Sequence, residues 1–305
     1  MEKNDRDYST SYRFSPWKMG FDIIAQLRTR LVYLSLVGMA IPLTVFEVYL
    51  AVIAEKKSEV FYNLNQAGVN RTFTDHLIPL SEYASHYGIS WFGITCFLLL
   101  VFFTFVKLCS DHFLGNKVKD TILWQHSLKT LVPRGILATL ILCVLTVMLT
   151  VLTMTVFSIF GQLLFLTAMA LCCAIPYLLV VEGQGPWKAI VNSLTLRYAP
   201  PIPGIKWSIF FQLSSALLFL VALMIFFAML KHYIVNLDLA LGIPRSIWAM
   251  SSPWPPLSWT YILAHFVYSF LVGLLLAAFA VITTTFFMII RQTRSMEDLL
   301  DAQDL

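Results

Sequence analysis

The segment Trp207–Leu230, "WSIFFQLSSALLFLVALMIFFAML", contains no charged residue and decides the class of this protein. About 20 apolar residues, rising about 1.5 Å each, cross the hydrocarbon core of a bilayer, so this segment is long enough to span one. The whole chain shares its character, because 58% of the 305 residues are hydrophobic and 12% are charged. A soluble domain would carry about 25% charged residues. The sequence therefore predicts an all-α membrane protein.

Further apolar segments raise the expected number of transmembrane helices to six. The stretch Gly135–Val181 is too long for one span, and we expect it to turn near Phe157–Gln162 and to supply two. The expected fold is a polytopic helical bundle. The predicted spans are Leu31–Ala54, Trp91–Cys109, the two halves of Gly135–Val181, Trp207–Leu230 and a helix within Ser258–Ile290.

The distribution of basic residues predicts the orientation of these spans. Cytoplasmic segments carry an excess of Lys and Arg. Most of the 21 Lys and Arg residues lie in the two tails and in the second-to-third and fourth-to-fifth connections, so both termini should be cytoplasmic. No apolar signal-peptide core precedes the first span, so that span should direct insertion into the inner (plasma) membrane. The expected parts are a cytoplasmic tail with an interfacial helix at 1–30, a six-helix transmembrane domain at 31–290, a cytoplasmic tail at 291–305, and external loops at Glu55–Ser90 and Lys231–Leu257.

The polar segment Glu182–Arg197, "EGQGPWKAIVNSLTLR", predicts a short helix between two apolar stretches. Pro186 suits the first helical turn, where its missing N–H would have no partner. An apolar stripe follows at helical spacing, while Lys188 lies away from it. Because the segment is too short to span a bilayer, we expect an amphipathic helix in the membrane interface. The stripe consists of Trp187, Ile190, Val191, Leu194 and Tyr198.

Two other segments have the same character, and each precedes a predicted span. They are Phe21–Leu31 and Thr121–Gly135. The strings "AQLRTRL", "HSLKTLV" and "NSLTLRY" align without gaps, which indicates either a threefold repeat or three independent basic juxtamembrane helices. The predicted membrane-interface residues are Phe21, Leu27, Trp124, Leu128, Trp187, Ile190 and Leu194.

The region around Glu182–Leu194 resembles the signature of YciC-type bacterial inner-membrane proteins. It is also similar to the membrane domain fused to some glycerophosphodiester phosphodiesterases. The resemblance implies a six-span fold but no particular reaction, and Tyr198–Trp207 departs from the short turn usual in that group. The matching residues are Glu182, Gly185, Pro186, Ala189, Ser193 and Leu194.

Glu47 and His265 are the candidate substrate-binding residues, because ionisable groups inside apolar segments often mark functional sites. Glu47 lies either about 10 Å inside the first span or, if that span ends near Tyr49, at the external interface. His265 forms either part of a site with Glu47 or a hydrogen bond between packed helices. A transport site would require a polar cavity near the midplane lined by both residues.

No motif indicates catalysis, a cofactor or a metal site. The sequence contains no phosphate-binding loop, no His-Glu-x-x-His motif and no Gly-x-Ser-x-Gly motif, and its six His are scattered. The basic residues lie next to span ends, which suits anionic lipids and not nucleic acid. We therefore expect a non-enzymatic protein with a role in envelope or lipid homeostasis, or a scaffold with a membrane-protein partner. The alternative is a small transporter or permease subunit that uses Glu47 and His265.

Overall fold

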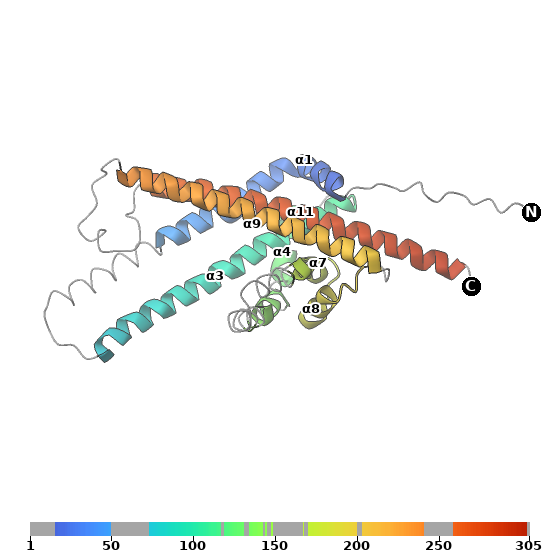
Figure 1. The fold of residues 1–305 in the computed structure, drawn as a ribbon, viewed down its shortest axis with the longest axis horizontal. Coiled ribbons are helices and arrows are strands. Elements are labelled where there is room, and N and C mark those ends of the chain that lie inside the picture. The colour runs from blue at the N-terminus through green and yellow to red at the C-terminus, as the bar shows by residue number, and fades with distance from the viewer. Residues whose placement is uncertain are drawn as a thin grey trace, which may run out of the picture.

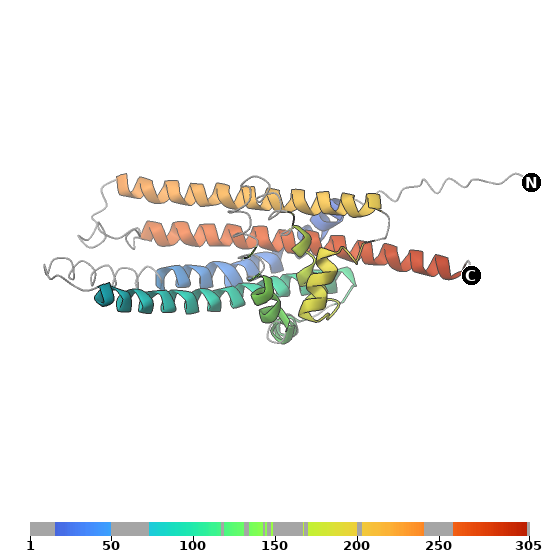
Figure 2. The ribbon, with the colours of Figure 1, turned by 60° about the horizontal axis from the view of Figure 1, so that its bottom comes forward.

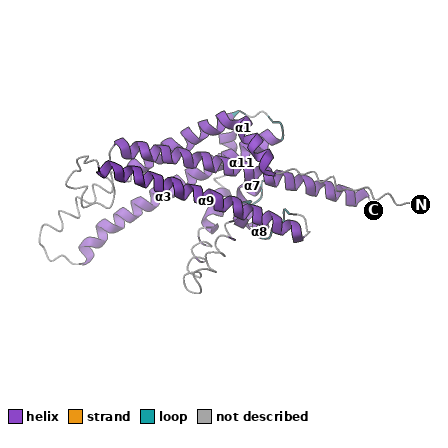
Figure 3. Cartoon of the chain, turned by 45° about the horizontal axis from the view of Figure 1, so that its top comes forward, coloured by secondary structure: helices purple, strands orange, loops and turns teal. Residues whose placement is uncertain are grey.

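A computed structural model describes residues 16–49, 73–116, 119–130, 134–142, 144, 148, 167, 170–199, 203–240 and 259–303. The named elements in these ranges are helices, and Figure 3 shows no strand among them. They are α1 (Pro16–Ser35), η1 (Leu36–Ala40), α3 (Phe73–Phe113), α4 (Asp120–Thr130), α7 (Ile175–Val180), α8 (Pro186–Leu194), α9 (Pro203–Ala240) and α11 (Trp259–Gln303).

Four long helices run side by side and form the frame of the molecule (Figures 1 and 2). Helix α11 contacts α1, α3 and α9. Helices α1 and α9 run in one direction, and α3 and α11 run in the other. One end of the bundle therefore combines the starts of α1 and α9 with the ends of α3 and α11. We call this the basic end, because it carries Lys18, Arg28, Lys107, Lys206 and Arg291.

Among the described residues, four helices are long and apolar enough to cross a membrane, as expected of a helical membrane protein. They correspond to the first, second, fifth and sixth predicted spans. The third and fourth predicted spans lie largely outside the described residues, although Ala170–Val180 forms a shorter apolar helix. The four long spans are Trp17–Tyr49, Phe92–Phe113, Gly204–Lys231 and Ile262–Gln292.

The helices extend beyond the boundaries predicted from the sequence. Helix α3 begins at Phe73, inside the segment predicted to be an external loop, and α9 continues past Lys231 to Ala240. Helix α11 continues through most of the predicted C-terminal tail to Gln303. A polar sequence can continue a helix into water, whereas hydropathy detects only the part that suits lipid.

The first helix is continuous where the sequence predicted a separate interfacial helix followed by a span. Residues Pro16–Ser35 form one helix, a π-helical turn follows at Leu36–Ala40, and the chain remains helical to Tyr49. The π-helical turn lies just before Pro42, whose missing N–H cannot bond the Gly38 carbonyl.

Small residues allow the central helices to approach closely. A Cβ atom on Gly273 of α11 would lie 3.0 Å from Met39 Cβ and 3.2 Å from Ser35 Cβ. A Cβ atom on Gly38 would lie 3.1 Å from a Val101 methyl group of α3. Glycine at both positions therefore brings α1 and η1 against α11 and α3, as small residues do between membrane helices.

Candidate functional site

The structure brings together four polar side chains at the end of the bundle opposite the basic end. The Lys231 Nζ lies 3.2 Å from His265 Nδ1 and 4.9 Å from the centre of the Tyr268 ring. Glu47 interacts electrostatically with Lys231, His265 and Tyr268. The predicted association of Glu47 with His265 is thus present, and we call the four residues the far-end cluster.

Lys231 is the member of the far-end cluster that the sequence analysis missed. The sequence predicts that Lys231 lies in an external loop, because the apolar segment ends at Leu230. Helix α9 instead continues through Lys231, whose side chain lies against His265 of α11. An ammonium group is only a donor, so His265 Nδ1 accepts and the imidazole proton lies on Nε2. The cluster therefore joins the first, fifth and sixth predicted spans through opposite charges and a hydrogen bond.

The far-end cluster lies too far from the basic end to occupy the middle of a bilayer. Along α9, the rise from Lys206 to Lys231 is about 38 Å at about 1.5 Å per residue. Along α11, the rise from His265 to Arg291 is about 39 Å. The hydrocarbon core is about 30 Å thick, and a tilt of about 20° shortens these distances by only about 2 Å. With the basic end at one membrane surface, the cluster lies at the other surface.

The helix predicted to begin at Pro186 is present as α8. Gly185 precedes it in an extended conformation, and Pro186 occupies the first turn. Its apolar stripe is divided between two environments: Ile190 is 1% exposed and packs in the protein core, whereas Trp187 is 66% exposed. Leu194 is also exposed. Trp187 and Leu194 are thus the exposed residues of the stripe, whereas Val191 and Tyr198 are half-buried.

Helices α4 and α8 show the same pattern of burial along their aligned sequences. Leu123 and Ser127 of α4 are buried, as are Ala189 and Ser193 at the matching positions of α8. The leucine that follows each serine, Leu128 in α4 and Leu194 in α8, is exposed. This agreement supports a structural relation between the second and third predicted units.

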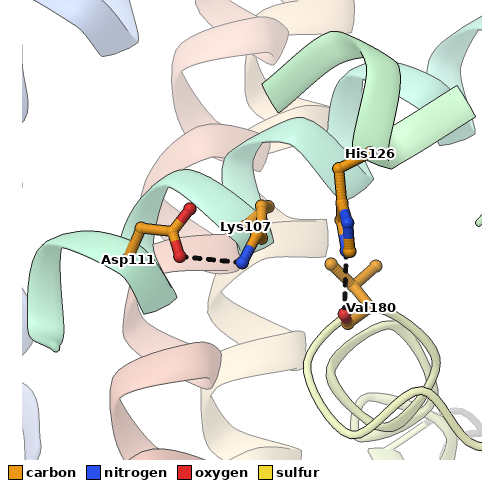
Figure 4. Close-up of polar contacts among 4 residues, drawn as sticks. All are labelled: Lys107, Asp111, His126 and Val180. Carbon is orange, nitrogen blue, oxygen red and sulfur yellow. Dashed lines mark hydrogen bonds and ion pairs between the residues drawn. The ribbon is translucent and has the colours of Figure 1, made fainter. Parts of the chain in front are cut away.

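Hydrogen bonds attach α4 and α8 to their neighbours through the two buried serines. Thr104 Oγ1 of α3 donates to Ser127 Oγ at 3.0 Å, and Ser193 Oγ donates to the Leu171 carbonyl oxygen. His126 Nε2 lies 3.2 Å from the carbonyl oxygen of Val180, which ends α7 (Figure 4). Helix α7 contacts both α4 and α8. The three helices, grouped on one side of the long helices in Figure 1, form what we call the α4–α7–α8 unit.

The predicted unit at Phe21–Leu31 does not share this register. Leu27 aligns with Leu128 and Leu194 in sequence, but it is 6% exposed and belongs to the protein core. Leu27 is buried because it belongs to an apolar stripe with Ile23 and Leu31. These residues recur at intervals of four, so they lie on one face of the helix, and this face packs inside the bundle. Phe21 is exposed, and Trp124 is half-buried. By burial, Leu27 corresponds to Ser127, one residue away from the sequence alignment.

Within the described part of the chain, no three His, Cys, Asp or Glu side chains group closely enough to hold a metal ion. Comparisons with protein families, with characterised proteins and with solved structures gave no significant match to this chain.

Proposed function

We propose that this protein is a non-enzymatic multipass protein of the inner (plasma) membrane that serves envelope or lipid homeostasis by holding lipids at the cytoplasmic leaflet. The α4–α7–α8 unit carries the proposal. Its exposed surface pairs apolar and basic neighbours, Trp187 with Lys188 and Leu128 with Lys129. Such pairs suit the boundary between acyl chains and anionic headgroups.

The proposed topology has six spans and places both termini in the cytoplasm. The basic end supports it, because α1 and α9 start there and α3 and α11 end there. An even number of crossings within Gly135–Val181 joins α4 to α8 on one side of the membrane. This arrangement agrees with the YciC-like resemblance of Glu182–Leu194.

Transport through the far-end cluster is the second candidate, favoured by the meeting of Glu47, Lys231 and His265. The distance from the basic end argues against it, since transporter sites typically lie near the bilayer midplane. We interpret the cluster as a structural connection between the helical segment 41–49, α9 and α11.

Purification from native membranes in a mild detergent, followed by identification of bound lipids and proteins, tests the proposal. We expect phospholipid to be retained at a reproducible ratio. A stoichiometric protein partner would indicate a scaffold, whereas a bound small solute would indicate transport. Loss of all bound lipid without loss of fold would contradict the lipid role.

A further inference from the structure

A polar cavity of about 340 Å³ lies where the loop after α7, helix α8 and the end of α11 meet. Its size falls within the range of about 300–1,000 Å³ typical of ligand pockets. Three basic side chains line it, Lys188, Arg197 and Arg291, together with one acidic side chain, Glu182. The charge of the lining is therefore positive. We call it the basic cavity.

A chain of hydrogen bonds fixes one wall of the basic cavity. Asn192 Nδ2 of α8 donates to Gln184 Oε1 at 2.9 Å, and Gln184 Nε2 donates to Glu182 Oε2 at 2.6 Å. The Gln184 backbone N–H also donates to the Leu178 carbonyl oxygen at 3.0 Å. The only acidic side chain of the lining is thus bound by a neutral amide, which holds it within the wall.

Tyr198, Phe287 and Arg291 form one side of the basic cavity. Arg291 interacts electrostatically with the Tyr177 hydroxyl and with Glu182. The Tyr198 hydroxyl is buried and has no hydrogen-bond partner among the described residues. The Tyr198 ring packs edge-on against Phe287, with 4.9 Å between ring centres.

We propose that the basic cavity binds a phosphate group, and that the group belongs to a phospholipid headgroup. Arginine and lysine side chains recognise phosphate through charge-assisted hydrogen bonds. The position favours a lipid, because the exposed Trp187 lies next to Lys188 and Phe287 lies within the apolar span of α11, which ends at Gln292. The inference rests on the proposed lipid role and adds the ligand chemistry and the site.

Reconstitution of the full-length protein into lipid nanodiscs tests this site. The discs contain phosphatidylcholine with phosphatidylglycerol, and native mass spectrometry after transfer to detergent counts the phosphatidylglycerol retained. The cavity variants are Arg291→Gln and the double variant Lys188→Gln/Arg197→Gln. Arg28→Gln is the matched control, because it removes an exposed charge at the same end of the bundle outside the cavity. Arg291→Lys restores the charge without the planar guanidinium.

We expect Arg291→Gln to lower phosphatidylglycerol affinity about tenfold, as loss of one charge-assisted hydrogen bond predicts, and the double variant to lower it further. Arg28→Gln should bind like the parent protein, and Arg291→Lys should recover part of the loss. Inorganic phosphate, titrated into lipid-depleted protein, separates free phosphate from lipid: a rise in melting temperature with no retained lipid assigns the site to free phosphate.

Equal retention of phosphatidylglycerol by the parent protein and all cavity variants, with no response to phosphate, would overturn the inference. The proposed lipid role would survive that result if native lipid still copurified with the protein. Circular dichroism identifies any variant that fails to fold. In that case, the parent protein is treated with an arginine-specific reagent in the presence and absence of phosphate. Protection of Arg197 and Arg291 by phosphate supports the site, and equal modification contradicts it.

Discussion

Asp111 is a carboxylate at 3% exposure near the basic end of α3, and one lysine holds it. Lys107 Nζ, one turn earlier, lies 2.8 Å from its Oδ1 (Figure 4), whereas Oδ2 has no hydrogen-bond partner among the described residues. Removing one partner of a buried ion pair strongly lowers the free energy of unfolding, because the other charge stays buried without an opposite charge nearby.

We predict that Lys107→Met lowers the free energy of unfolding by about 3–5 kcal/mol. The double variant Lys107→Met/Asp111→Asn should recover much of this loss, since the amide carries no charge. Denaturant or thermal unfolding in detergent measures both. Equal destabilisation by the single and double variants would show that the ion pair is not the cause.

Gly183 occupies the left-handed region, with φ of 63°, in the loop that leads to α8. A Cβ atom there would also lie 3.3 Å from an Arg134 guanidinium nitrogen. We predict that Gly183→Ala destabilises the protein by about 1–2 kcal/mol, the cost of a left-handed conformation for an L-residue.

Gly204→Ala is the control for this substitution. Gly204 lies in the first turn of α9, and a Cβ atom added there would meet no atom within 4 Å, so alanine should be neutral or stabilising. Melting temperatures in detergent compare the two variants. A similar loss in both would refute the conformational explanation.

Burial raises the pKa of Tyr198 above its usual value, so the folded protein favours the neutral phenol. A raised folded-state pKa gives stability that is present below about pH 10, where the unfolded phenol ionises, and is lost as the pH rises further. Tyr198→Phe should therefore show a smaller fall in melting temperature between pH 8 and pH 11, measured with and without bound lipid. An unchanged fall would place the hydroxyl in water.

At the scale of elements, α8 separates what a sequence pattern can predict from what it cannot. Pro186 predicted the start of the helix, whereas the apolar stripe, which continues to Tyr198, overestimated its length because α8 ends at Leu194. The pattern could not decide that Ile190 faces protein while Trp187 faces outward, because both are apolar and packing partners distant in sequence make that choice. The same limit explains Leu27, whose surroundings come from the other helices of the bundle.

We predict that the outward face of α8 contacts acyl chains. In a cysteine-free background, a spin label on Leu194→Cys should collide with oxygen more than with a soluble nickel complex. The neighbouring exposed position, Thr195→Cys, should show the reverse. Equal access of nickel to both labels would place α8 in water.

At the scale of the whole molecule, the positions of the four long apolar spans followed from hydropathy, since an uncharged segment of membrane length has few alternatives. The full helix lengths did not, because α3, α9 and α11 continue through polar sequence. The far-end cluster could be predicted from the sequence only in part. Glu47 and His265 drew attention as polar residues in apolar surroundings, but Lys231 did not, because nothing local indicates that α9 continues beyond Leu230. The basic cavity was not predicted, since its charges come from residues far apart in sequence.

The far-end cluster makes a prediction for the bundle as a whole. Lys231→Met should lower stability by about 1 kcal/mol, typical of a partly exposed ion pair, and Glu47→Gln by a similar amount. Because these residues interact, the double variant should cost less than the sum of the single variants. Thermal unfolding measures this coupling, and strictly additive losses would show that Glu47 and Lys231 act separately.

Among the described helices, α9 packs mainly on α11 and carries apolar side chains on its other faces, such as Phe211, Phe219 and Phe226. The ribosome makes α9 before α11, so α9 emerges with its main partner still unmade. A helix that is apolar all round is stable in lipid by itself. Helix α9 can therefore insert into the bilayer before α11 is synthesised. Once α11 has also inserted, the two helices associate laterally and complete the bundle.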